Sequence, residues 1–152
     1  MNAATDTQPL ALTLTRLFDA PRDLVWAAFT RHDMLMAWWG PVPHPATVVD
    51  MDVRVGGTWR NCLQSPDGKE TLWQNGVYTE VTPPSRLAFT FTWEDGESAD
   101  ANEVIIDFED VGGQTRLTLH QTPFRTEPSR DGHGFGWNSS FDRLAEHLKT
   151  KD

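Results

Sequence analysis

The chain has 152 residues, of which 38% are hydrophobic and 23% are charged. This composition is typical of one folded globular domain and not of a disordered chain. The net charge of −9 and the pI near 4.9 argue against a nucleic acid or an anionic membrane as partner. The single cysteine, Cys62, excludes an intrachain disulfide and favours a reducing cytoplasm.

Residues 1–9 lack the basic cluster and apolar stretch of a signal peptide, so we expect a flexible tail followed by one domain over residues 10–150. The sequence contains no run of about 20 apolar residues that would predict a membrane-spanning helix. These observations predict a cytoplasmic protein with no membrane partner.

The first half of the chain predicts a strand, two short helices and two further strands. Alternating leucines predict a strand over residues 10–18. A helix is expected from Pro21, and a second one from Thr30, with Asp33 completing a capping box and Gly40 ending the helix. After a proline-rich loop over 41–45, alternation predicts strands at residues 47–55 and 58–64.

The second half predicts four more strands and one long amphipathic helix. The expected strands cover residues 72–81, 87–93, 103–109 and 116–121. An acidic stretch over 93–110, which has no Lys or Arg, is expected to be a solvated hairpin; the alternative is a patch for a basic partner protein. The final helix is predicted from a stripe of apolar residues four, three and four positions apart, preceded by alternating glycines: Trp137, Phe141, Leu144 and Leu148, after Gly132, Gly134 and Gly136.

This order of elements predicts an α+β fold in which a curved antiparallel sheet wraps around the long C-terminal helix, with two short helices after the first strand. Short turns between successive strands favour antiparallel pairing, and a helix with one apolar stripe needs a concave surface to cover it. A space between helix and sheet is expected where the Pro- and Gly-rich loops meet.

Several short motifs together resemble the activator of heat-shock protein 90 ATPase homologue-like family, in the START-like (SRPBCC) superfamily. They follow one another at residues 16–26, 38–41, 56–59, 66–68, 76–81, 83–87, 113–119 and 136–148. The resemblance implies the helix-grip fold of START and Bet v 1-like proteins and a cavity for a small apolar molecule. It implies no shared catalytic motif. We expect the single domain to act without the separate chaperone-binding region of the eukaryotic co-chaperones that give the family its name.

Aromatic residues are the main candidates for the wall of a binding site. Rings supply a large apolar contact area at small entropic cost, and the alternative interpretation is ordinary core. Asn61 and Asn75 share their strand parity with Trp59 and Trp73, so their amides would orient a ligand if that parity faces the cavity. The candidate ligand-binding residues are Trp38, Trp39, Trp59, Asn61, Trp73, Asn75, Phe89, Phe91, Trp137 and Phe141, with Trp93 in the same aromatic set.

Other polar residues give weaker signals. Arg16 is expected to form a structural pair with an Asp or Glu rather than to bind a ligand carboxylate. His44 and His133 are expected in loops at the mouth of the cavity, where a catalytic role is the minor alternative. No ligand spacing for a metal, no phosphate-binding glycine loop and no nucleophile elbow is present, so no cofactor, metal or catalytic residue is predicted.

The leading hypothesis is a protein that binds a small apolar or aromatic molecule without covalent chemistry. One alternative is a co-chaperone-like or stress-response protein that binds a protein partner through its outer surface. The other is a cyclase- or hydrolase-like enzyme that uses the same cavity. A mostly apolar cavity favours binding, titratable groups within hydrogen-bond reach inside it favour catalysis, and a filled interior favours the interaction protein.

Overall fold

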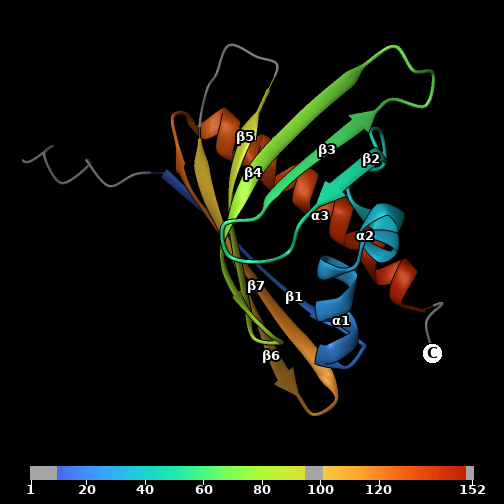
Figure 1. Ribbon diagram of the computed structural model, residues 1–152, viewed down its shortest axis with the longest axis vertical. Helices are drawn as coiled ribbons and strands as arrows, with labels where there is room; N and C mark the ends of the chain where they lie inside the picture. Colours follow the sequence, from blue (N-terminus) through green and yellow to red (C-terminus); the bar gives the residue numbers. More distant parts are fainter. Residues whose placement is uncertain (1–9, 95–100, 150–152) are drawn as a thin grey trace, which may run out of the picture.

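The computed structural model describes residues 10–94 and 101–149 (Figure 1). The predicted flexible tail over residues 1–9, the central part of the acidic hairpin at 95–100 and the end of the predicted domain at residue 150 lie outside the described residues.

Seven antiparallel strands form one curved sheet in the order β1-β7-β6-β5-β4-β3-β2. In Figure 1 this sheet curves around the long helix α3, and the short helices α1 and α2 lie beside α3 on the same side of the sheet. The expected α+β helix-grip architecture is therefore confirmed. The strands are β1 (Leu10–Phe18), β2 (Ala46–Met51), β3 (Thr58–Gln64), β4 (Thr71–Thr82), β5 (Arg86–Trp93), β6 (Asn102–Val111) and β7 (Gln114–Phe124).

The two short helices, α1 (Arg22–Thr30) and α2 (His32–Trp38), follow the first strand as predicted. Pro21 occupies the N-cap of α1. The predicted capping box at Thr30 is wrong, because the Thr30 hydroxyl donates back to the Trp26 carbonyl within α1 (2.9 Å). Arg31 is the N-cap of α2 and makes no side-chain cap bond.

The predicted strand over residues 47–55 ends earlier than its alternation indicates, at Met51. Beyond that point the backbone folds into a turn, in which Arg54 N donates to Asp52 O and Gly57 N donates to Arg54 O. Val55, the last residue of the predicted strand, is 63% exposed in this turn.

The long helix α3 (Glu127–Lys149) starts ten residues before the expected stripe, so the three glycines lie inside it. The hydroxyl of Thr126 accepts a hydrogen bond from Ser129 N (3.1 Å), which satisfies one of the free amides of the first turn. Glu127 and Pro128 also suit a first helical turn. The helix therefore begins at this capping residue and continues through the three glycines.

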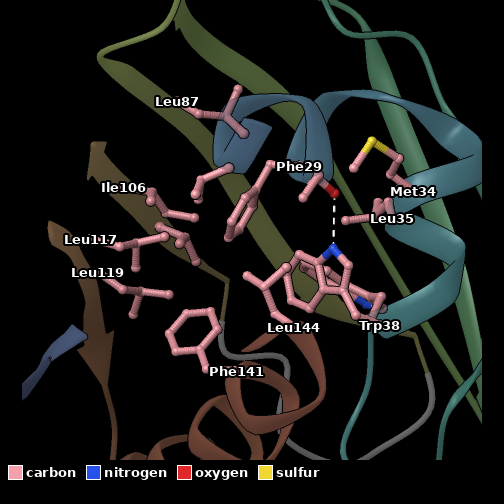
Figure 2. Close-up of a cluster of buried hydrophobic side chains, with 14 of the residues drawn as sticks. Phe29, Met34, Leu35, Trp38, Leu87, Ile106, Leu117, Leu119, Phe141 and Leu144 are labelled. Carbon is pink, nitrogen blue, oxygen red and sulfur yellow. Dashed lines mark hydrogen bonds between the residues drawn. The ribbon is translucent and has the colours of Figure 1, made fainter. Parts of the chain in front are cut away.

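The C-terminal half of α3 packs into the main hydrophobic core (Figure 2). Phe141 and Leu144 are fully buried against α1, α2 and the inner face of the sheet. Trp38 is also fully buried, and its indole N–H donates to the Ala28 carbonyl (2.9 Å). The burial of Phe141 and Leu144, on which the predicted fold depends, is thus observed.

Candidate functional site

An open cavity of about 500 Å³ lies beside the N-terminal half of α3, next to the part of the helix that packs in the core. Its walls come from α3, the loop between α2 and β2, and the inner face of β3, β4 and β5. Rings and aliphatic groups make up most of this wall. Its larger apolar residues include Trp39, Pro41, Pro43, Leu63, Leu72, Phe91, Trp93, Phe135 and Trp137.

Arg143 fixes the loop between α2 and β2 to α3. Its guanidinium donates to four carbonyls at 2.8–3.1 Å, with Nη1 sharing its two hydrogens among three of them; the carbonyls are those of Ala37, Trp38, Trp39 and Gly40. Burial lowers the pKa of this guanidinium. The last carbonyls of a helix have no partner within the helix, and the C-terminus carries a partial negative charge. The guanidinium therefore gives the last carbonyls of α2 hydrogen-bond donors and offsets this charge.

Gly40 ends α2 with φ +94°, a conformation that a residue with a Cβ adopts only with strain. A Cβ at this position would also lie 2.6 Å from the His44 carbonyl oxygen and 2.9 Å from Leu63. A second link from the loop to α3 is the bond from Val42 N to the Ser139 hydroxyl (2.9 Å). The loop thus presents Trp39 to the cavity from a fixed backbone.

Each of the three tryptophans in the wall donates its indole N–H to a side chain. Trp39 donates to the amide oxygen of Gln74 (3.0 Å), and Trp137 donates to the amide oxygen of the fully buried Gln121 (2.8 Å). Trp93 donates to Nε2 of His133 (2.9 Å). These bonds fix the ring planes, so the wall has a defined shape.

His133 lies on α3, and not in a loop as the sequence predicts. Its Nε2 accepts from the indole of Trp93, and its Nδ1 lies 2.8 Å from the Ser129 carbonyl oxygen. A carbonyl only accepts and an indole only donates, so these partners fit the neutral imidazole with the proton on Nδ1. In this arrangement the imidazole orients the Trp93 ring.

His44 lies in the predicted loop and borders the cavity. Its Nε2 is 2.7 Å from Oε1 of Glu70, which the sequence did not identify as its partner because 26 residues separate the two. The His44 side chain is 24% exposed and that of Glu70 is 67% exposed. A carboxylate–imidazole pair therefore stands at the rim of the cavity, on the side of solvent.

The predicted ligand-binding residues separate into four groups, of which three lie on the inner side of the sheet. Trp39, Phe91 and Trp137 line the cavity together with Trp93. A second space of only about 10 Å³ is bordered by Trp59, Asn61 and Phe89. Trp38 and Phe141 belong to the core and do not border the larger cavity.

Trp73 and Asn75 lie on the outer face of the sheet. They are therefore not on the same face as Trp59 and Asn61, whose neighbours on β4 are Gly76 and Gln74. The Arg60 guanidinium covers the Trp73 ring at 3.9 Å from its centroid. Asn75 Nδ2 donates to Glu94 (2.9 Å). Two hydrogen bonds from Arg60 and one from Asn75 lower the pKa of Glu94 to about 2. These residues form a surface network rather than a ligand site.

Sequence reasoning missed the polar residues of the inner face. Gln74 and Gln121 are buried, at 4% and 0% exposure, and each accepts from a tryptophan. The available signal was the parity of Gln74 with Leu72 and Tyr78 on β4, which lie on the same side of the strand. Arg16, by contrast, forms the expected structural pair, with Nη2 2.9 Å from Asp142 Oδ1.

The described residues contain no group of three or more His, Cys, Asp or Glu side chains arranged to hold a metal ion. Within the same described part of the chain, none of the helices combines the length and the apolar character needed to cross a bilayer.

A family model, described as activator of Hsp90 ATPase homolog 1-like protein, matches residues 19–149. The AHSA1 protein from Silicibacter pomeroyi has a similar structure, with a TM-score of 0.83 and 26% identity over 94% of this chain and 100% of the other. A protein from Nitrosomonas europaea has a TM-score of 0.79 and 28% identity over 93% and 96% of the two chains.

CalU16 from Micromonospora echinospora shares the fold at 22% identity, with a TM-score of 0.69 over 91% of this chain and 75% of that one. No protein with a curated description matches the chain.

Proposed function

The chain belongs to the activator of Hsp90 ATPase homolog 1-like family, and on that premise we propose that it binds a small apolar or aromatic molecule in the cavity beside the N-terminal half of α3. The cavity is the single observation that carries this proposal. Its volume of about 500 Å³ falls within the range of about 300–1,000 Å³ that small-molecule sites occupy. A protein that acts only through its outer surface would be expected to have a filled interior. The cavity therefore supports ligand binding over that alternative.

The packing of α3 supports the same function. Gly132 and Gly136 border the cavity one helical turn apart, and a Cβ added at either position would have no heavy atom within 4 Å. Glycine inside a helix costs about 0.8–1 kcal/mol relative to alanine. The helix therefore gives up stability at positions where larger side chains would occupy the cavity.

The direct test is a titration of ¹⁵N-labelled protein with 2-ethylnaphthalene, followed by NMR. The indole N–H signals of Trp39, Trp93 and Trp137 should shift, because these rings line the cavity. The signal of Trp73, on the outer face, serves as an internal control. The absence of any shift in the three cavity signals, up to the solubility limit of the probe, would refute binding of an apolar ring at this site.

A pair of variants separates the cavity from the rest of the surface. Leu72→Trp replaces an aliphatic side chain of the wall by a bulky ring, which should fill part of the cavity and weaken probe binding at least tenfold. Leu17→Trp makes the same change at a side chain that is 54% exposed on β1 and should leave binding unchanged. Native mass spectrometry of freshly purified protein would then show whether a molecule of this class is carried from the cell.

Catalysis is the second candidate, and the His44–Glu70 pair at the rim is the observation that favours it. A histidine oriented by a carboxylate is a common form of general base. The test is the chemical state of a co-purified molecule after incubation with the protein. Recovery of the unchanged molecule favours binding alone, whereas conversion that is lost in His44→Gln favours an enzyme.

A further inference from the structure

The amide of Gln74 is a polar group in an otherwise apolar part of the cavity wall. The residue lies on the inner face of β4, opposite Trp93 of β5 in the sheet register, and is 4% exposed. Its oxygen accepts the indole N–H of Trp39 (3.0 Å).

The bond with Trp39 determines which end of the amide faces the cavity. An indole N–H only donates, so the amide oxygen must point to Trp39 and the NH₂ group must point elsewhere. Within residues 10–94 and 101–149, Gln74 Nε2 makes no hydrogen bond, and it is not one of the fully buried polar atoms that lack a partner, so it faces the open cavity. A bound ligand would bury this donor, and buried donors are nearly always paired in folded proteins, so the donor favours a ligand that carries an acceptor.

Two other polar side chains of the wall, those of His133 and Ser140, already have partners. His133 is bonded through both ring nitrogens, to Trp93 and to Ser129. The Ser140 hydroxyl donates to the Gly136 carbonyl (2.9 Å). Ser129 is only half-buried at the start of α3, so Gln74 is the buried side chain whose donor remains for a polar group of the ligand.

The wall also defines the charge of that polar group. Among the described residues that line the cavity, none is Lys or Arg. A carboxylate placed here would lose its water without gaining a cation, which is costly. A neutral carbonyl oxygen meets the donor at no such cost, and the tryptophan and phenylalanine rings around it suit a planar apolar body.

We propose that the ligand is an uncharged aromatic carbonyl compound, such as an aryl ketone, whose oxygen accepts a hydrogen bond from Gln74 Nε2. This inference rests on the proposed binding function and names the chemical class that the site selects. Gln74 is thus the specificity-determining residue of the cavity.

The test compares three probes of nearly equal shape: 2-acetylnaphthalene, 2-ethylnaphthalene and 2-naphthoate. The ketone should bind about five- to tenfold more tightly than the ethyl compound, which is the contribution of one neutral hydrogen bond. It should also move the Gln74 side-chain NH₂ signals in NMR spectra, whereas the ethyl compound should not.

The variant Gln74→Met removes the donor at similar side-chain volume and should abolish the preference for the ketone. Gln64→Met, at the end of β3 and outside the cavity wall, is the matched control and should keep it. If Gln74→Met does not fold, two measurements on the wild-type protein still test the role of Gln74: the preference for the ketone over the ethyl probe, and the shift of the Gln74 NH₂ signals.

The outcomes separate the two proposals. Equal affinity for ketone and ethyl probe overturns the role of Gln74 and leaves the binding function intact. Tightest binding of the naphthoate overturns the assignment of a neutral ligand. Binding of none of the three overturns the binding function itself.

Discussion

Replacement of Arg143 by methionine tests whether α3 holds the cavity loop in place. The variant keeps the aliphatic stem and removes four hydrogen bonds to the end of α2. One bond to a charged group contributes about 1.5–3 kcal/mol, but the four share one guanidinium, and water can reach some of the released carbonyls. We therefore expect the free energy of unfolding to fall by about 2–4 kcal/mol, well below the sum of four bonds.

The measurement is a urea melt, with thermal unfolding as a second probe. For a chain of this size the loss corresponds to a decrease in Tm of roughly 4–16 °C. Arg143→Lys retains a cation without the planar fork of donors, so it should lie between methionine and the wild type. The affinity for 2-ethylnaphthalene should fall as well, because Trp39 and Gly40 border the cavity.

The matched control is Arg86→Met. Arg86 pairs with Asp107 on the surface of the sheet, and the two side chains are 45% and 46% exposed. An exposed pair of this kind contributes about 0–1 kcal/mol. A loss for Arg143→Met no larger than that of the control would refute the reasoning.

Three further predictions test the cavity, the core and the surface. Gly136→Ala should raise the free energy of unfolding by about 0.5–1 kcal/mol, because alanine favours the helix and the added Cβ meets no other atom. The same Cβ extends into the cavity and should weaken probe binding. A destabilised variant in urea melts would contradict this. Trp137→Phe leaves the buried oxygen of Gln121 without its indole donor, so melts should show a loss of about 1–3 kcal/mol, and a neutral result would mean that the bond contributes nothing. The pKa of Glu94, near 2 in the folded state, lies below its unfolded value of about 4.3; its charge therefore stabilises the fold above that pH and the contribution is lost as the pH falls towards 2. Stability measured between pH 4.5 and 2 should fall less steeply in Glu94→Gln, and parallel curves would exclude this role.

The fold was largely predictable because each element carries a strong period. Leucines at every second position defined β1, and the four-three-four spacing from Trp137 to Leu148 defined the buried face of α3. The start of α3 was missed because glycines weigh against a helix, although the capping signal at Thr126 was readable.

The site was less predictable than the fold because the faces of β4 look alike in sequence. One face carries Trp73 and Asn75, and the other carries Gln74 and Gly76. An aromatic residue is normally the buried one, but here the guanidinium of Arg60 covers Trp73 on the outside. Contacts of this kind join residues from different strands, so one sequence read alone does not contain them.

The pairing of β1 with β7 has a consequence for synthesis on the ribosome. The first strand bonds to the last, with Leu10 opposite Phe124 and Phe18 opposite Thr115. At about 5–20 residues per second, translation leaves β1 without its neighbour for roughly 5–20 seconds. During that time β1 has no strand to pair with, and completion of the sheet must await synthesis of β7, which ends at Phe124. Nascent chains stalled before β7 should therefore be open to proteases along β1, and the released chain should resist them.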